Sequence, residues 1–262
     1  MQFFSKPDAW FGLCGDLRCV TVTRRISGAP AFMRGLRALF VTDVHALPRT
    51  KQADFDALMR KIADAKPDLL LLGGDYADQQ QPCLRLLDGL KRVSAPLGTF
   101  GVVGNNDREA FGDIEALRRA MSNAGITLLL NESHTLRVNG GRLILAGLDE
   151  YKYGRPDATG LYPGSPSPDC YRLLLSHFPR RIDPMPDLML SGHTHGGQFN
   201  LLGLNPYTIG FERLLTRRRS PEFISGLHAV DGAQVFVSKG IGASRIPLRA
   251  CVRPEIDLLI FV

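Results

Sequence analysis

Several short runs of the chain are almost wholly apolar and end in polar residues. The clearest are the four leucines at 69–72 and the three leucines at 173–175. A strand that is apolar on both faces has to be buried on both faces, as in the interior of a layered structure. These runs therefore predict a sheet that other elements cover on its two sides.

Helical patterns lie between the first of these runs. Apolar side chains recur at helical spacing over 55–62, 84–90 and 114–121, and Asp113 is placed to cap the third helix. The first half thus alternates strands with helices, and the second half is rich in strands. Two sheets with helices outside accommodate this order, with strands expected at 19–24, 36–42, 68–73, 99–103, 126–130, 135–138, 142–147, 171–176, 187–191, 226–231, 234–238 and 255–261. The segment 151–169, rich in proline and glycine, is expected to be a long surface loop.

The composition is that of an ordinary globular protein, with 44% hydrophobic and 22% charged residues in a chain of 262. It excludes a mainly disordered chain, a collagen and a coiled coil. No run approaches the roughly 18–20 apolar residues of a membrane span. Residues 1–20 lack the apolar core of a signal peptide, and the five cysteines form no CxxC pair. We therefore expect a cytoplasmic protein with reduced thiols.

Polar residues of a similar kind follow five of the expected strands. In parallel α/β sheets, ligands bind outside the carboxyl ends of the strands, so these residues should gather at one edge. Carboxylates, an amide oxygen and imidazoles suit hard to borderline metal ions. Seven ligands are too many for one tetrahedral ion, and they suit two ions that share a carboxylate, an arrangement used in phosphoryl transfer. The seven residues are Asp43, His45, Asp75, Asn105, His177, His193 and His195.

Two of these clusters have ligands two residues apart. In an extended strand the side chains of residues i and i+2 point the same way. Asp43 and His45 are therefore expected to converge by strand alternation, as are His193 and His195. His134 and His228 have no such neighbours and are expected to be structural.

The order of the motifs resembles that of the calcineurin-like metallophosphoesterases. The chain has DVH at 43–45, GDYAD at 74–78, GNND at 104–107, the lone His177 and GHTH at 192–195. The family has DxH, GDxxD, GNH followed by Asp or Glu, a lone His, and GHxH. The resemblance covers the chain from Leu36 onward and implies an α/β fold, a four-layer α/β/β/α sandwich. Residues 1–35 would then be an N-terminal extension with an added strand, and residues 36–262 the metallophosphoesterase domain.

The resemblance also implies a role for each ligand. Asp43, His45 and His195 would bind the first ion, Asn105, His177 and His193 the second, and Asp75 would bridge them. The expected cofactors are two divalent ions from among Mn, Fe, Zn and Mg, with manganese favoured. The implied activity is hydrolysis of a phosphate ester by a hydroxide that the two ions activate.

The chain departs from the family at Asn106, where the family has a histidine that helps to protonate the leaving oxygen. An amide does not release a proton near neutral pH, and general-acid help contributes roughly 10²–10⁴-fold. We therefore expect a phosphodiesterase or pyrophosphatase-type hydrolase, unless another group supplies the proton or Asn106 is merely tolerated. Asp107, which in the family would orient the missing histidine, could have lost that role here, and it is grouped with Asp75 and Asn106 as catalytic.

Basic side chains near the motifs are candidates for phosphate binding. Arg49 follows His45 by four residues, and Arg180 and Arg181 follow His177 closely. We predict Arg49 and Arg180 as substrate-binding residues, with solvated surface charge as the alternative.

The sequence SGHTHGGQ at 191–198 is similar to a bacterial branch of the family that includes UDP-2,3-diacylglucosamine hydrolases and whose members often carry a membrane anchor. Aromatic residues at the N-terminus and the basic run 217–219 suit an anionic membrane surface, although ordinary packing is the alternative. The expected partners are a phosphate-ester substrate, which could be a lipid, and the surface of the inner membrane. No specific nucleic acid and no protein partner is expected. The aromatic residues are Phe3, Phe4, Trp10 and Phe11.

Two other functions remain open. The net charge of +6 permits a nuclease of the same superfamily. A non-catalytic scaffold with this fold is the second alternative, but such a protein would be expected to lose metal ligands, and all seven are present.

Overall fold

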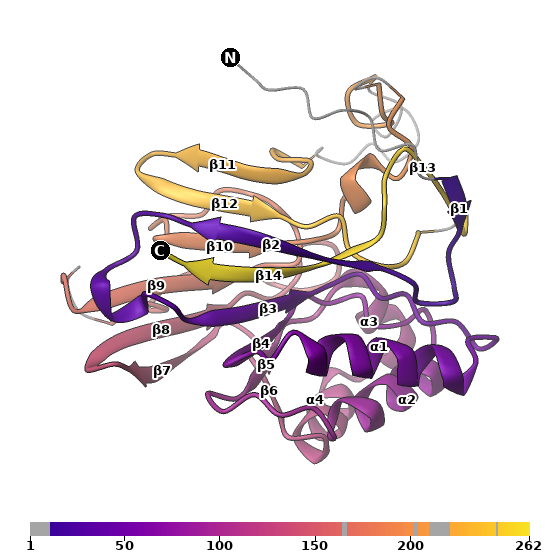
Figure 1. The fold of residues 1–262 in the computed structure, drawn as a ribbon, viewed down its shortest axis with the longest axis horizontal. Coiled ribbons are helices and arrows are strands. Elements are labelled where there is room, and N and C mark those ends of the chain that lie inside the picture. The colour runs from indigo at the N-terminus through magenta and orange to yellow at the C-terminus, as the bar shows by residue number, and fades with distance from the viewer. Residues whose placement is uncertain (1–10, 164–166, 202–203, 210–220, 245) are drawn as a thin grey trace.

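The computed structural model describes residues 11–163, 167–201, 204–209, 221–244 and 246–262. Two six-stranded sheets stack on one another, and a layer of helices lies against the first (Figure 1). The strand order in the first sheet is β2-β14-β3-β4-β5-β6. Its strands are β2 (Val20–Ile26), β3 (Arg37–Val41), β4 (Leu69–Leu72), β5 (Thr99–Gly101), β6 (Ile126–Leu128) and β14 (Glu255–Phe261).

The second sheet has the order β11-β12-β10-β9-β8-β7. Strands β8, β9, β10 and β12 run parallel to one another, and the two edge strands are antiparallel to their neighbours. These strands are β7 (Glu132–Val138), β8 (Gly141–Gly147), β9 (Cys170–Leu175), β10 (Leu188–Ser191), β11 (Gly226–Val230) and β12 (Ala233–Val237).

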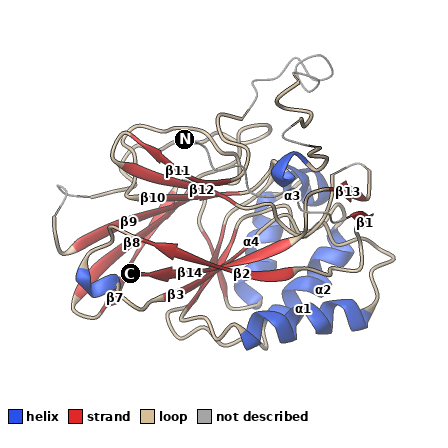
Figure 2. Cartoon of the chain, turned by 45° about the horizontal axis from the view of Figure 1, so that its top comes forward, coloured by secondary structure: helices blue, strands red, loops and turns tan. Residues whose placement is uncertain are grey.

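Four helices cover the outer face of the first sheet (Figure 2). Two of the predicted apolar stripes lie on buried faces: Phe55 and Leu58 in one helix and Leu117 in another pack against the sheet. In the second predicted helix Leu84 is exposed, which corrects that stripe, because Leu86 and Leu87 form the buried face there. The Asp113 side chain caps α4 by accepting a hydrogen bond from the Glu115 amide, as predicted. The helices are α1 (Gln52–Asp64), α2 (Gln80–Leu90), α3 (Asn105–Phe111) and α4 (Ile114–Asn123).

The leucine run in β4 is buried on both faces, as predicted. Leu70 and Leu72 pack into the core beneath the helices, whereas Leu69 and Leu71 pack into the core between the sheets. The second sheet contributes Leu173 and its neighbours to that inter-sheet core. Burial of so much apolar surface is the main force that holds the two sheets together.

The outer face of the second sheet is covered by loops. Leu161 from the segment 151–163 and Phe223 pack on Leu174 and Met189 of this sheet. In the described part of the chain no α-helix lies there. The α/β fold and the paired sheets are thus confirmed, and loops form the fourth layer.

Three short elements were not expected from the sequence. Strands β1 (Phe11–Leu13) and β13 (Leu248–Ala250) form a separate two-stranded sheet, and each is too short to show periodicity. Helix α3 begins at Asn105, inside a motif whose Gly-Asn start is more typical of a turn.

Strand β2 extends the first sheet by parallel pairing with β14. The division of the chain into an N-terminal extension and a domain at residue 36 stays a prediction.

Candidate metal centre

The seven predicted ligands follow strands whose carboxyl ends meet between the two sheets. Strands β3, β4 and β5 are parallel neighbours in the first sheet, as are β9 and β10 in the second. The loops after β3 and β4 stay paired, since the Asp43 amide donates to the Gly74 carbonyl at 2.9 Å and the His45 amide to the Asp75 carbonyl at 3.1 Å. This pairing holds the two carboxylate-bearing loops side by side.

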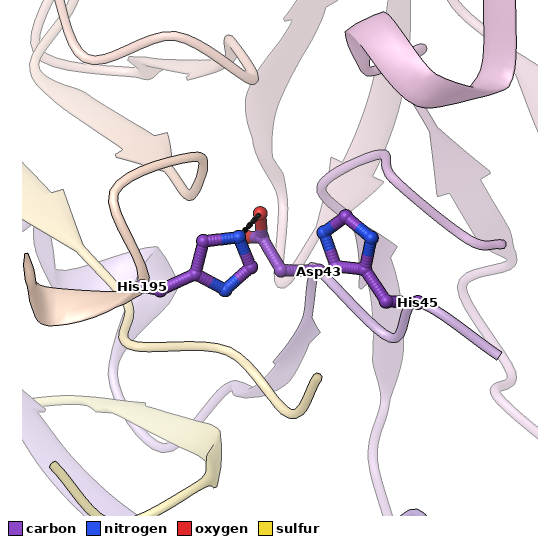
Figure 3. Close-up of side chains that lie close together, drawn as sticks. All are labelled: Asp43, His45 and His195. Atoms are coloured by element: carbon purple, nitrogen blue, oxygen red, sulfur yellow. Dashed lines mark ion pairs between the residues drawn. The ribbon is translucent and has the colours of Figure 1, made fainter. Parts of the chain in front are cut away.

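Asp43, His45 and His195 form the first group of candidate ligands. All three are buried, and one donor atom from each lies within 4.8 Å of those of the other two. Asp43 Oδ1 lies 3.6 Å from His195 Nε2, and the ring centroids of His45 and His195 are 4.9 Å apart. Figure 3 shows the two imidazoles on either side of Asp43. The set matches the ligands predicted for the first ion.

Asp75 joins this group to a second one. Asp43, Asp75 and His177 also have donor atoms within 4.8 Å of one another. Asp75 Oδ2 lies 3.5 Å from His45 Nε2 and 3.4 Å from His177 Nε2, so a single oxygen reaches both groups. His193 joins them through Nδ1, which lies 3.2 Å from His177 Nε2. This is the geometry expected of a bridging carboxylate.

The backbone at the ligands is not extended, which corrects the prediction of strand alternation. Five of the seven have a positive φ of 44–68°, a left-handed conformation that costs non-glycine residues on the order of 1–2 kcal/mol each. The side chains therefore converge through left-handed turns beyond the strand ends. The five are Asp43, His45, Asp75, His193 and His195.

Two glycines allow the loops to approach the carboxylates. A Cβ atom at Gly104 would collide with Asp75 Oδ1, and one at Gly192 would collide with Asp43 Oδ2. The backbone amide that follows Gly192, that of His193, donates to both oxygens of Asp43 at 3.0 Å. The glycines are thus part of the construction of the site.

Buried charges dominate the electrostatics of the cluster. Burial works against protonation of His177, but the carboxylates of Asp75 and Asp43 and the Gly73 carbonyl together outweigh it and raise the pKa of His177 to about 10. Burial also disfavours ionisation of Asp75, yet the nearby His177 and His45 hold the pKa of Asp75 well below its usual range. Burial and the neighbouring His177 lower the pKa of His193 to about 3.

The residues fit a metal centre. His45 Nε2 is buried and has no hydrogen-bond partner among the described residues, although it faces Asp75 Oδ2. When two donor atoms bind the same ion at about 2.0–2.1 Å in tetrahedral geometry, they lie about 3.4 Å from each other. The donor separations of 3.4–3.6 Å are close to this spacing and longer than good hydrogen bonds. Oxygen and imidazole donors of this kind suit Mn, Fe or Zn.

Asp107 lies in the cluster as an acceptor for backbone amides. It is completely buried and accepts hydrogen bonds of 2.8 Å from the backbone amides of Asp75, Tyr76 and Gly104. Burial and the nearby charge of Asp75 raise the pKa of Asp107 to about 7. The orienting role that Asp107 would have in the family is thus replaced here by another: it ties the loop after β4 to the loop after β5.

Asn106 instead contacts Asp78, with 3.0 Å from its Nδ2 to Asp78 Oδ1. Its backbone amide donates to Asp75 Oδ1 at 2.8 Å. Asn105, the remaining predicted ligand, is the first residue of α3 and donates from Nδ2 to Asn106 Oδ1 at 2.7 Å. Residues 105 and 106 thus lie at the edge of the cluster.

The predicted phosphate-binding arginines lie in different surroundings. Arg49 is exposed and its guanidinium lies near Gly15. Arg180 is half-buried, with Cζ 5.7 Å from the centroid of the Tyr151 ring. Phe178 connects this place to the cluster, because its ring centroid lies 5.5 Å from that of Tyr151 and 4.8 Å from that of His193. Arg180 is therefore the better candidate of the two.

Sequence reasoning missed one buried cation behind the cluster. Arg249 is fully buried, and its Nη2 lies 3.1 Å from His195 Nδ1 and 2.7 Å from the Lys239 carbonyl. Its Nε donates to the Gly242 carbonyl at 2.6 Å. The residue stands in a short strand far along the chain from the motifs, so only the folded arrangement reveals the contact.

Comparison with known proteins identifies relatives of this chain. The model of the calcineurin-like phosphoesterase family matches residues 36–197. The uncharacterized metallophosphoesterase YkuE of Bacillus subtilis is 28% identical over 90% of this chain and 82% of its own length. The phosphodiesterase YaeI of Escherichia coli is 30% identical over 85% of this chain and 81% of its own length. The solved phosphopantetheinyl hydrolase PptH of Mycobacterium tuberculosis superposes with a TM-score of 0.47 and 12% identity, covering 83% of this chain and 96% of that one.

The chain belongs to the calcineurin-like phosphoesterase family. It is a metal-dependent phosphoesterase, a hydrolase whose substrate is a phosphate ester. Among the described residues, no helix has the length and apolar character needed to cross a bilayer. Of the segments considered for a membrane surface, residues 1–10 and the basic run 217–219 lie outside the described residues.

Proposed function

We propose that this hydrolase cleaves a phosphodiester or pyrophosphate bond at a centre of two divalent ions, with manganese as the favoured metal. Asp43, His45 and His195 would hold one ion, Asn105, His177 and His193 the other, and Asp75 both. When bound, such ions activate water and neutralise charge on the phosphate. The support for two ions is the position of Asp75 Oδ2, 3.5 Å from His45 Nε2 and 3.4 Å from His177 Nε2.

The choice of bond rests on Asn106. Its amide is hydrogen-bonded to Asp78 and Asn105, and an amide has no proton to give to a leaving oxygen at neutral pH. Such an enzyme favours leaving groups that are stable as anions, as in a pyrophosphate link or an aryl ester. Alkyl phosphomonoesters, whose alkoxide leaving groups need a proton, are then poor substrates.

The remaining side chains orient the reacting groups. Asp107 holds the loops of Asp75 and Gly104 together, which fixes the bridging carboxylate. Arg180, beside Tyr151 and Phe178, is proposed to bind the phosphate or its substituent from the His193 side. Arg49 is proposed as a second phosphate contact.

The test is the rate against the leaving-group pKa for a series of phosphodiesters and monoesters, with the metal content of the enzyme verified. We expect rates that fall steeply as the leaving-group pKa rises, with aryl diesters far ahead of alkyl monoesters. Alkyl monoesters hydrolysed as fast as aryl diesters would contradict the proposal.

We also propose that the substrate is a lipid with a phosphate or nucleotide head group, met at the cytoplasmic face of a membrane. Exposed apolar side chains project from β1, from residues 201 and 204–209 and from residue 246, and β1 and β13 are hydrogen-bonded to each other. The Gln198 side chain, in the loop that carries His195, donates to the carbonyls of Ile246 and Leu248. The exposed residues are Phe11, Leu13, Leu201, Leu204, Ile209 and Ile246.

Vesicle co-sedimentation tests this second proposal. We expect binding to vesicles with anionic lipid that weakens with salt and with the double change Phe11→Ser and Leu13→Ser. The change Leu227→Ser, at an exposed leucine of β11, is the matched control. No binding to anionic vesicles, or equal binding by both variants, would contradict it.

A further inference from the structure

A chain of hydrogen bonds links Asp78 to candidate ligands of both ions. Asp78 Oδ1 lies 2.7 Å from His45 Nδ1 and 3.0 Å from Asn106 Nδ2. Asn106 Oδ1 accepts a hydrogen bond from Asn105 Nδ2 at 2.7 Å. His45 and Asn105 belong to different ligand sets, so one pair of side chains contacts both.

The shared acceptor determines which nitrogen of His45 carries the proton. Asp78 Oδ1 can only accept, so Nδ1 donates to it, and Nε2 is left with its lone pair. The distance of 3.1 Å between His45 Nδ1 and Asn106 Nδ2 then separates two donors that use the same carboxylate oxygen. Nε2 is the buried atom that has no hydrogen-bond partner and faces Asp75. Carboxylates that orient a metal-binding histidine in this way are common in metal sites.

Asn106 makes the corresponding selection at two other ligands. Asn106 Nδ2 donates to Asp78, so Asn106 Oδ1 faces Asn105 and accepts a hydrogen bond from Asn105 Nδ2. Asn105 Oδ1 is then the atom of that amide left to act as a metal ligand. Its backbone amide donates to Asp75 Oδ1 at 2.8 Å, and Asp75 Oδ2 is the oxygen that faces His45 and His177. Each of these hydrogen bonds uses one polar atom of a candidate ligand and leaves the other polar atom of that ligand to bind an ion.

We propose that Asp78 and Asn106 act together as positioning residues that select His45 Nε2, Asn105 Oδ1 and Asp75 Oδ2 as the atoms that face the ions. The proposal rests on the proposed metal centre but not on the choice of phosphoester. The Asp78 side chain is 37% exposed, so the fold does not depend on its burial.

The experiment measures Mn²⁺ binding to the metal-stripped full chain by calorimetry, and ions per chain by elemental analysis after desalting. We expect Asp78→Ala to weaken binding by about 10–100-fold and Asn106→Ala by about tenfold. The two changes combined should weaken it less than the product of the single effects, since both residues act through one network. Asp78→Asn keeps a carbonyl oxygen at the acceptor position and should recover part of the loss.

The matched control is Asp88→Ala, which removes an exposed carboxylate that pairs with Lys91 on α2. It should bind Mn²⁺ as the wild type does. If the wild type binds no ion, both the metal centre and this proposal fail. If the wild type binds two ions and the Asp78→Ala and Asn106→Ala variants bind them equally tightly, only the positioning proposal fails. Circular dichroism of the metal-free variants completes the test, since a loss of binding with lost folding in both Asp78 variants would also overturn it.

Discussion

The same strands build two very different environments a few residues apart. Between the sheets, Leu71 and Leu173 lie in regular extended backbone among apolar neighbours. Just beyond the strand ends, Asp43 and Asp75 are equally buried, but they stand in left-handed backbone among imidazoles. The core thus supplies stability without chemistry, whereas the strand ends give up regular backbone geometry and bring charged side chains together. Backbone strain of this kind persists only where surrounding structure enforces it.

Of the changes at the strand ends and in the core, Asp75→Asn should have the largest effect on activity. Loss of the charge on the bridging carboxylate is expected to lower kcat/KM by about a thousandfold or more, because charge stabilisation at such sites contributes several kcal/mol. The fold should remain, since the core is untouched. Steady-state kinetics on an aryl phosphodiester measures the effect, with Asp88→Asn as the control. A metal-loaded Asp75→Asn enzyme with the wild-type rate would contradict the view that the strand ends, and not the core, carry the catalytic charge.

Leu71→Ala is the converse change in the core. The cavity that it leaves between the sheets should lower the free energy of unfolding by about 2–5 kcal/mol. At a temperature where the protein stays folded, kcat/KM should change less than about twofold. Urea denaturation and kinetics on the same sample check both. A large fall in kcat/KM of the folded variant would indicate that the core and the strand ends are coupled.

Added metal ions should raise the free energy of unfolding by binding to the ligands at the strand ends, and not elsewhere on the chain. At a free Mn²⁺ concentration about 100-fold above Kd, the gain in stability is about 2.7 kcal/mol. We expect the Tm of the wild type to rise by roughly 5–10 °C, and that of Asp75→Asn to rise far less. Chelation should reverse the shift and abolish activity. Thermal scans with equal shifts in the two proteins would show that the ion binds elsewhere.

Asn106→His is expected to have the smallest effect of these changes, and it tests whether residue 106 limits proton supply at the strand ends. A histidine there would face Asp78 and could protonate a leaving oxygen. Hydrolysis of alkyl esters should rise by about tenfold, below the range of well-placed general acids, while aryl esters change little. A rate increase that is the same for alkyl and aryl esters would show that proton supply is not what residue 106 limits.

Much of the fold follows from local patterns. The leucine run of β4 and the apolar stripe of α1 have the periodicity that burial requires, and both are confirmed. The strands β1 and β13 were missed because three residues show no period. The loop layer over the second sheet was also beyond prediction, because scattered contacts such as Leu161 on Leu174 leave no regular spacing in the sequence.

The candidate site was predictable in its members but not in its geometry. The motifs identified the residues that gather, yet strand alternation was the wrong reason for the approach of His45 to Asp43, whose φ angles are positive. The partner of Asn106 was also missed, since nothing in the spacing distinguishes Asp78 from Asp107 as its acceptor. Such contacts depend on the direction of single side chains, which the sequence pattern does not specify.

The most direct test of the metal centre is anomalous diffraction from crystals grown with Mn²⁺. We expect two peaks roughly 3.5–4 Å apart, with Asp75 between them, His45 and His195 at one peak and His177 and His193 at the other. A single peak, or peaks that these side chains do not surround, would contradict it.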